Sequence, residues 1–374
     1  MSAKGRIAIL TSGGDAPGMN AAIRAATLVG LAKGADVVGI ERGYRGLLDG
    51  AFVPLGAGDV QGILREGGTI LGTARCKEFH ERAVRDQARR VLHDRGITGL
   101  VVVGGNGSLM GALALTDPAE APSDGPVPPP RIVGVPASID NDIGLTGLSI
   151  GVDTAMNTIV EACDKIADTA TAHDRTFIVE VMGRDCGYLA MSSAIAAGAD
   201  LVLFPEAHRT EAQIVDAVVR TVLAARNRDR RHRRVIAIKA EGVHVQIDRL
   251  KQQVDARLNA EIAGEPAAIE TRVTVLGHVV RGGRPSAFDR LLGSRLANVA
   301  VQALFAGKTA RMAAWMPPVE LEEEIGQRSV ADPYCWLVDL GAVIVETENL
   351  LAGRSPLARW RAGIFDELED VLTQ

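Results

Sequence analysis

The chain has 374 residues, 47% hydrophobic and 23% charged, a balance typical of a globular protein large enough for two domains. The formal net charge of −5 leaves no general basic field that would attract nucleic acid, and no apolar run reaches the roughly 18 residues needed to span a membrane. Aromatic residues make up only 3% of the chain, while glycine occurs 41 times. A core of small and branched aliphatic side chains favours an α/β protein with a sheet buried under helices.

The four cysteines are widely separated and form no C-x-x-C pair, so they predict neither a zinc site nor a disulfide framework. The N-terminus lacks the pattern of a secretory signal peptide. We therefore expect reduced thiols and a cytoplasmic protein.

Apolar strands that break into glycine-rich turns recur along the first third of the chain. The strand at 7–10 runs into the turn 11–20 and a helix over 20–32, and the strand at 101–103 runs into the turn 104–108 and a helix over 108–115. Glycines let backbone N–H groups approach an anion, and the helix that follows adds its positive N-terminal end. A phosphate site is one interpretation of each turn, and a plain tight turn is the other. The first turn matches neither a Walker A loop nor the G-x-G-x-x-G fingerprint.

A pair of carboxylates follows the next apolar strand, at 131–135. Asp140 and Asp142 stand in the stretch P-A-S-I-D-N-D, where a buried strand opens into a loop. Since residues i and i+2 of an extended segment share a face, we expect both carboxylates to meet one small polar substrate. The alternative is a turn or helix-start cluster, in which Asp and Asn are common.

The remainder of the chain alternates helices and strands. A proline-rich segment at 116–130 indicates a surface insertion, and the basic run 226–234 is either a solvated segment or a site for a polyanion. The apolar spacing predicts a helix over 151–171, a strand-like run at 342–345 and an amphipathic helix over 356–372, whose apolar side includes Trp360, Ile364, Phe365, Leu368 and Leu372. That helix packs in a core or contacts another subunit. Further strands are expected at 36–40, 177–181, 201–204, 235–238 and 273–276.

Several long motifs resemble those of the 6-phosphofructokinase family, in the same order from about residue 6 to residue 300. They are T-S-G-G-D-A-P-G-M-N-A-A-I-R from Thr11, G-G-T-I-L-G-T-A-R from Gly67, G-G-N-G-S from Gly104, S-I-D-N-D from Ser138, E-V-M-G-R from Glu180, A-E-G-V from Ala240 and R-V-T-V-L-G-H-V-V-R-G-G-R-P from Arg272.

The resemblance implies two parallel-sheet, three-layer α/β/α domains with the active site in the cleft between them. We expect residues 1–151 plus about 280–330 to form a larger nucleotide-binding domain. Residues 152–279 plus about 331–374 would form a smaller domain that binds a sugar phosphate.

Phosphoryl transfer to an alcohol needs the hydroxyl to be positioned and relieved of its proton, and needs the charge on the moving group to be neutralised. The resemblance makes Asp140 the general base, with Ser138 and Asp142 beside it on the substrate. Arg75 and Arg184, with the backbone at Gly14, would hold the transferring phosphoryl group.

The acceptor implied by the resemblance is a sugar that already carries a phosphate. Residues that would contact the sugar are Met182, Gly183 and Glu241, and those that would bind its 6-phosphate are Arg175, Arg272, His278 and Arg281. In the family, the counterparts of Arg175 and Arg272 reach across from a neighbouring subunit, so we expect a homo-oligomer, either a dimer or a tetramer.

The donor implied by the resemblance is ATP with Mg²⁺. Gly107 matches the glycine of ATP users, where pyrophosphate users have an aspartate, and Ala137 is not the lysine typical of pyrophosphate users. The expected nucleotide-binding residues are Gly14, Tyr44, Arg75, Cys76, Gly105, Asn106, Gly107, Ser108 and Gly111.

The sequence also departs from the family pattern. Asn106 stands where the family has an acidic residue that helps to hold Mg²⁺, so we expect weakened metal binding. Arg24 matches a basic residue of the effector pocket in the bacterial enzymes of the family, but Leu28 and Ala167 stand where those enzymes have arginines. Arg233 and Arg234 of the basic run offer replacement positive charge. An effector site there would be weak or different.

The motifs together predict transfer of a phosphoryl group from Mg·ATP to the 1-hydroxyl of fructose 6-phosphate. One alternative is a kinase of the same fold that uses pyrophosphate or another sugar phosphate, such as sedoheptulose 7-phosphate. A second alternative is a weakly active or non-catalytic regulatory paralogue, because Asn106 replaces the acidic residue of the metal-binding motif.

Overall fold

The computed structural model describes residues 5–117, 119, 129–226, 233–262, 271–316, 325–361 and 363–364. Its chain divides into two compact units, residues 1–154 with 281–349 and residues 155–280 with 350–374. The expected proline-rich insertion and the middle of the basic run lie largely outside the described residues.

The first unit is built on an eight-stranded sheet in the order β11-β12-β10-β5-β4-β1-β2-β3. Strands β2, β1, β4, β5 and β10 are mutually parallel, while β3, β12 and β11 run antiparallel to their neighbours. Strand bounds are β1 Arg6–Ser12, β2 Asp36–Ile40, β3 Phe52–Pro54, β4 Ile97–Gly104, β5 Arg131–Pro136, β10 Arg311–Trp315, β11 Gly326–Arg328 and β12 Cys335–Asp339.

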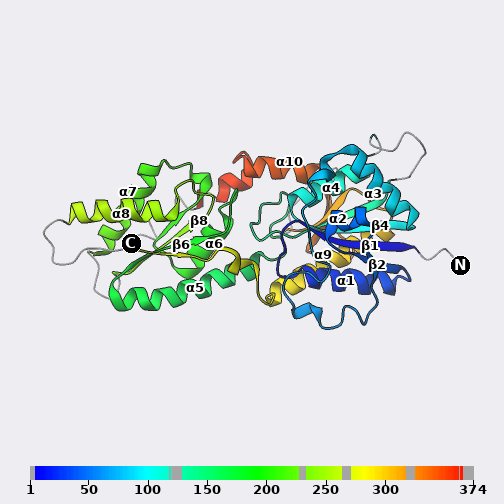
Figure 1. Ribbon diagram of the computed structural model, residues 1–374, viewed down its shortest axis with the longest axis horizontal. Helices are drawn as coiled ribbons and strands as arrows, with labels where there is room; N and C mark the ends of the chain where they lie inside the picture. Colours follow the sequence, from blue (N-terminus) through cyan, green and yellow to red (C-terminus); the bar gives the residue numbers. More distant parts are fainter. Residues whose placement is uncertain are drawn as a thin grey trace. The chain divides into compact units, whose positions relative to one another are not determined.

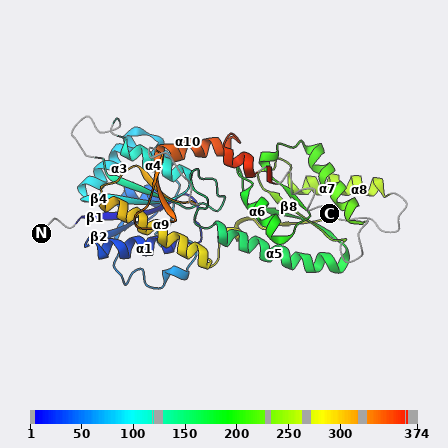
Figure 2. The same cartoon turned by 180° about the vertical axis from the view of Figure 1, so that it is seen from behind.

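Helices cover both faces of this sheet. Figures 1 and 2 show α1 (Met19–Ala32) and α9 (Ala287–Phe305) side by side on one face, with α3 (Arg82–Asp94) and α4 (Asn106–Thr116) on the other. The short α2 (Gly43–Asp49) packs against α3, and α10 (Leu340–Leu351) follows β12. Because both faces are covered, central strands are buried along almost their whole length, as seven of the eight residues of β4 are.

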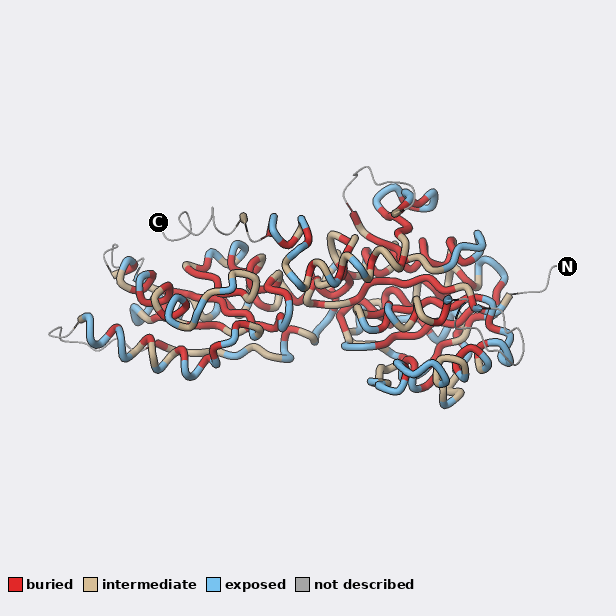
Figure 3. The backbone as a smooth tube through the Cα atoms, turned by 90° about the horizontal axis from the view of Figure 1, so that it is seen from above, coloured by how far each residue is buried: buried red, intermediate tan, exposed pale blue. Residues whose placement is uncertain are grey.

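The second unit contains a four-stranded, all-parallel sheet in the order β7-β8-β6-β9. Its strands are β6 Thr176–Val181, β7 Leu201–Leu203, β8 Val235–Ala240 and β9 Thr271–Val275. Its helices are α5 Val152–His173, α6 Tyr188–Ala197, α7 Glu211–Arg226 and α8 Ile247–Glu261. Figure 3 shows strand segments of both units as buried and much of the helix surface as exposed.

Two expectations for the C-terminal region were wrong. Residues 342–345 are not a strand but lie in α10, where Leu340, Val343 and Thr347 are buried at helical spacing. Residues 331–349 belong with the first unit, because β12 pairs with β10 in the eight-stranded sheet. Trp360 is 63% exposed, so of the two alternatives for the helix over 356–372 a contact with another subunit suits this residue better than a core. Phe365, Leu368 and Leu372 lie outside the described residues.

Candidate active site

Glycine-rich turns meet at one edge of the first sheet. Strands β1, β4 and β5 are parallel neighbours, so the turns that follow Ser12, Gly104 and Pro136 all emerge at their carboxyl ends. The turns are tightly packed, since a Cβ on Gly104 would lie 2.4 Å from the Ser12 carbonyl oxygen. Gly18 has a φ of 111° and caps the N-terminus of α1.

A pocket of ≈ 590 Å³ opens at this edge, within the size range of small-molecule sites. All nine residues expected to bind a nucleotide line it, from Gly14 of the first turn to Gly111 of α4. Sequence reasoning missed further lining residues that follow Arg75 and Cys76 directly in the chain. They include Lys77, Phe79, His80 and Arg85.

Tyr44 forms an aromatic wall of this pocket. Its hydroxyl donates to the Ser108 carbonyl oxygen at 2.6 Å, and its ring stacks on Phe79 with centroids 4.1 Å apart. Burial raises the pKa of the Tyr44 phenol above its ordinary value, so the group stays neutral. A Cβ on Gly111 would lie 3.0 Å from the ring, so this glycine leaves room for the tyrosine.

The charge of the pocket lining is mainly positive. Arg75, Lys77 and Arg85 line it, and Asp142 is the one carboxylate among the described lining residues. Arg85 also donates to the Phe79 and His80 carbonyl oxygens and so fixes the short helix Lys77–His80. Such a lining suits a polyanion with an aromatic part.

The loop after β5 turns sharply instead of extending. Asn141 has a φ of 51° and is fully buried, with its side chain bonded to the Gly147 carbonyl oxygen and the Ser149 N–H. The expectation that Asp140 and Asp142 share the face of an extended segment was therefore wrong. Asp142 lines the pocket and accepts a hydrogen bond from the Ser138 hydroxyl at 2.6 Å. Asp140 is partly exposed on the same loop but is not among the residues that line the pocket.

Asn106 begins α4 at the pocket wall. Its side-chain oxygen is buried and accepts no hydrogen bond from the described part of the chain. No group of three or more His, Cys, Asp or Glu suited to a metal occurs among the described residues. These residues fit a Mg²⁺ ion held mostly by substrate phosphates, with the Asn106 oxygen and Asp142 as the protein groups in reach of the pocket.

The second unit brings another set of candidates to the carboxyl edge of its own sheet. Met182, Gly183 and Arg184 follow β6, Glu241 follows β8, and His278 lies in the short helix Gly277–Arg281 after β9. The loops after β6 and β8 are joined, because the Gly242 N–H donates to the Gly183 carbonyl oxygen at 3.1 Å.

Arg175 and Arg272 lie at the opposite edge of the same sheet. Arg175 precedes β6 and Arg272 is the second residue of β9, where it pairs with Phe177. At about 3.3 Å per residue, the length of β6 separates them from Met182 by roughly 20 Å. The structure therefore does not bring these two arginines together with Met182, Gly183 and Glu241 within one chain.

Arg281 belongs to the first unit and lies over the first glycine turn. Its guanidinium donates to the Asp15 carbonyl oxygen at 3.3 Å, and a Cβ on Gly14 would lie 2.8 Å from its Nη1. Gly14 therefore keeps the turn clear for this arginine.

The family model for phosphofructokinase matches residues 6–304 of the chain. The chain belongs to the phosphofructokinase family. An ATP-dependent 6-phosphofructokinase of Clostridium botulinum is 45% identical over 82% of this chain and 88% of the relative, and one of Thermotoga neapolitana is 44% identical over 83% and 89%.

Solved phosphofructokinase structures share the fold. The T-state enzyme of Pichia pastoris superposes with a TM-score of 0.81 at 35% identity, covering 98% of this chain but 37% of that longer one. A pyrophosphate-dependent phosphofructokinase of Marinobacter aquaeolei gives a TM-score of 0.73 at 21% identity, which bears on the fold alone. Together these comparisons confirm the predicted family and the α/β fold. In the described part of this family member, no helix combines the length and apolar character that a membrane crossing requires.

Proposed function

We propose that the chain transfers the γ-phosphoryl group of Mg·ATP to the 1-hydroxyl of fructose 6-phosphate. Relatives named ATP-dependent 6-phosphofructokinase, 44–45% identical over more than four fifths of the chain, support this activity. The observation that carries the proposal is the pocket of the first unit, where basic side chains, close-packed glycine turns and the Tyr44–Phe79 stack lie together.

Gly107 supports ATP as the donor. It lines the pocket, and a Cβ placed on it would meet nothing within 4 Å. The space beside Gly107 is open, so a nucleotide can occupy it and an aspartate side chain would fill it. Ala137 also favours ATP, because pyrophosphate users tend to have lysine at this position.

In the proposed reaction Asp140 accepts the proton of the 1-hydroxyl as the oxygen forms its bond to the γ-phosphorus. The bond from that phosphorus to the β,γ-bridging oxygen breaks, and ADP leaves with the electron pair. Ser138 and Asp142 position the sugar through the hydrogen bond between them. Arg75, Arg184 and backbone N–H groups near Gly14 neutralise the transferring group.

Bound together with the donor, Mg²⁺ would offset charge on the phosphates, and Asn106 and Asp142 are the residues that would hold it. Asn106 offers a neutral oxygen where a carboxylate would add a charge, so the protein's share of metal binding is small.

The acceptor is proposed to be recognised by residues of the second unit and by Arg281. Met182, Gly183 and Glu241 are proposed to contact the sugar, while His278, Arg281, Arg175 and Arg272 are proposed to bind the 6-phosphate. Arg175 and Arg272 lie at the amino edge of the second sheet, whereas Met182 lies at its carboxyl edge. We therefore propose that each site takes these two arginines from a neighbouring copy of the chain. Guanidinium groups suit a phosphate dianion through paired hydrogen bonds.

A cytoplasmic location is part of the proposal, in keeping with the four free cysteines.

The test is turnover of the purified chain with ATP or pyrophosphate as donor and fructose 6-phosphate or sedoheptulose 7-phosphate as acceptor. We expect the highest kcat/KM for ATP with fructose 6-phosphate. A preference for another donor or acceptor would overturn the substrate assignment, and absence of turnover with every pair would overturn catalysis itself.

A further inference from the structure

We propose that a second pocket, between the β7–α7 loop and the β8–α8 loop, binds a small phosphate ester with an apolar body. The pocket has a volume of ≈ 450 Å³ and lies wholly within the second unit. Strands β7 and β8 are parallel neighbours, so both loops leave the carboxyl edge of the sheet, where open α/β sheets bind ligands. None of its described lining residues has a role in the proposed phosphoryl transfer.

The floor of this β7–β8 pocket is apolar. Leu203 and Phe204 at the end of β7, Ile214 of α7 and Val243 of the β8–α8 loop are all buried and line it. Surface of this kind favours a ligand with a hydrocarbon or ring portion over a bare ion.

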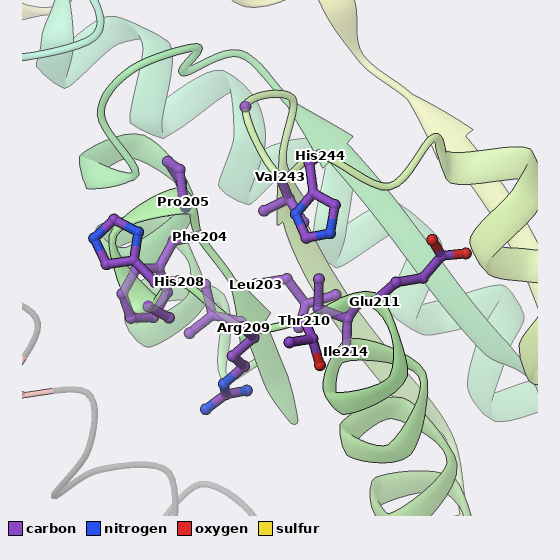
Figure 4. Close-up of a pocket in the computed structure, with 13 residues that line it drawn as sticks. Leu203, Phe204, Pro205, His208, Arg209, Thr210, Glu211, Ile214, Val243 and His244 are labelled. Carbon is purple, nitrogen blue, oxygen red and sulfur yellow. The ribbon is translucent and has the colours of Figure 1, made fainter.

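The rim of the pocket supplies cationic and hydrogen-bond-donating groups from both loops. His208 and Arg209 come from the β7–α7 loop and His244 from the β8–α8 loop. Figure 4 shows these three side chains around the ends of Leu203 and Phe204. An arginine and two imidazoles that two loops contribute around one apolar floor are suited to a phosphoryl group.

The carboxylate in the lining does not cancel this charge. Glu211 accepts hydrogen bonds from Arg249 Nε and Gln253 Nε2 of α8, each at 2.6 Å. In Figure 4 its carboxylate is directed away from the two histidines and Phe204. Glu211 is therefore bonded to α8, and its carboxylate is not directed toward the basic rim.

The pocket is joined to the proposed sugar-binding loop by short contacts. Gly242 of its wall donates to the Gly183 carbonyl oxygen at 3.1 Å, and a Cβ on Gly242 would lie 1.8 Å from the Arg184 carbonyl oxygen. On the other side, Glu206 accepts from the Gly187 N–H at 2.8 Å. A ligand that moves either loop must therefore shift residues 182–187.

This coupling, which rests on the proposed function, gives the pocket a regulatory role. Occupation should change the KM for the sugar phosphate while the KM for ATP stays the same, because the contacts lead to Met182 and Gly183 and not to the nucleotide pocket. By linkage, the sugar phosphate must change the affinity of the pocket ligand by the same factor.

The binding test uses the full-length chain and isothermal titration calorimetry with phenyl phosphate, inorganic phosphate and phenol. We expect phenyl phosphate to bind most tightly, since it alone has both the anion and the apolar body. His244→Glu and Arg209→Gln should each weaken this binding by about tenfold. His244 is exposed, so its replacement should leave the fold intact.

Arg220→Gln is the matched control, because Arg220 lies on α7 outside the pocket and its side chain is 73% exposed. Equal phenyl phosphate affinity in wild type, His244→Glu and Arg209→Gln would overturn the proposed site, as would no binding by the wild type. These calorimetric outcomes do not depend on turnover. If binding is found and the KM for the sugar phosphate does not change, the regulatory role alone is overturned.

Discussion

Asp140 is the residue on which the proposed chemistry depends most directly. Its replacement by asparagine keeps the size of the side chain but removes the proton acceptor, so kcat should fall by about 10²–10⁴-fold. ATP affinity should stay the same, because Asp140 does not line the pocket of the first unit in which the nucleotide is proposed to bind. Steady-state kinetics and calorimetric ATP binding measure the two effects. Asp36→Asn, at the exposed start of β2, is the control, and an equal loss of kcat in both variants would refute the role.

Gly107 offers a test of donor choice that does not disturb the fold. Because a Cβ there meets nothing within 4 Å, Gly107→Asp should fold normally and yet place a charged side chain in the pocket. We expect the KM for ATP to rise at least about tenfold, with the melting temperature nearly unchanged. Gly104→Ala is the informative contrast, since its Cβ would contact the Ser12 carbonyl oxygen and should destabilise the protein. An unchanged KM for ATP in Gly107→Asp would place the nucleotide elsewhere.

A substitution at Asn106 tests the metal assignment by strengthening Mg²⁺ binding instead of removing it. Asn106→Asp adds a carboxylate at the start of α4, where the amide oxygen is buried without a donor among the described residues. The Mg²⁺ concentration that gives half-maximal rate should fall, because a carboxylate attracts Mg²⁺ more strongly than an amide. Titration of activity with free Mg²⁺ measures this. The same half-maximal concentration in wild type and variant would remove Asn106 from the metal site.

At the scale of elements, Arg295 of α9 joins the β10–β12 region of the first sheet. Its guanidinium forms two hydrogen bonds with Asp332 and lies beside the stacked rings of Trp315 and Tyr334, 4.9 and 4.8 Å from their centres. Hydrogen bonds from Arg295 hold the pKa of Asp332 below its ordinary value. The Asp332 carboxylate therefore stabilises the fold above its unfolded-state pKa, and that contribution is lost as pH falls through the lowered pKa.

Asp332→Asn should accordingly lower the melting temperature at neutral pH and have a smaller effect in acid. Removing Asp332 leaves a partly buried guanidinium, whose side chain is 23% exposed, without its carboxylate, at a cost of about 1–3 kcal/mol at pH 7. Thermal unfolding at several pH values measures the difference. Glu161→Gln breaks the Glu161–Lys165 pair, whose side chains are 69% and 72% exposed, and should have little effect. Equal destabilisation by Asp332→Asn at neutral and acid pH would contradict the assignment.

The elements themselves were largely predictable where local patterns determine them. Strands such as β1 and β4, with their glycine turns, follow from apolar runs that stop at small residues, and these runs are buried as expected. The strand prediction at residues 342–345 was wrong because four consecutive apolar or small residues suit a strand as well as a helix. The burial of Leu340 and Val343 in α10 decides for the helix. The turn at Asn141 was missed because its left-handed conformation depends on bonds to Gly147 and Ser149, which tertiary packing supplies.

The candidate site was predictable only as far as motifs extend. All nine expected nucleotide-binding residues line one pocket, but Lys77, His80 and Arg85 were missed because single charged residues outside a motif carry no signal of their own. The β7–β8 pocket was missed for a related reason. His208, Arg209 and His244 come from two loops more than 30 residues apart, and only the pairing of β7 with β8 brings them together.

At the scale of the whole molecule, the position of Arg272 bears on assembly. Arg272 lies near the amino end of β9, whereas Met182 and Glu241 follow the carboxyl ends of β6 and β8. A site that uses all three residues therefore needs more than one copy of the chain. Symmetric homo-oligomers meet this need, because each copy gives its arginine to a neighbour and receives one in return.

Subunit complementation tests this arrangement. Asp140→Asn and Arg272→Ala should each be nearly inactive alone, since every site lacks either the base or a phosphate ligand. When the two variants are mixed, unfolded and refolded together, some sites combine an intact Asp140 from one copy with an intact Arg272 from its neighbour. Random pairing in equal amounts makes about a quarter of the sites complete, so activity should recover to about that fraction of wild type. Refolding each variant separately and mixing afterwards is the control. If activity does not return although the co-refolded chains form mixed oligomers, Arg272 does not act on a neighbour's site.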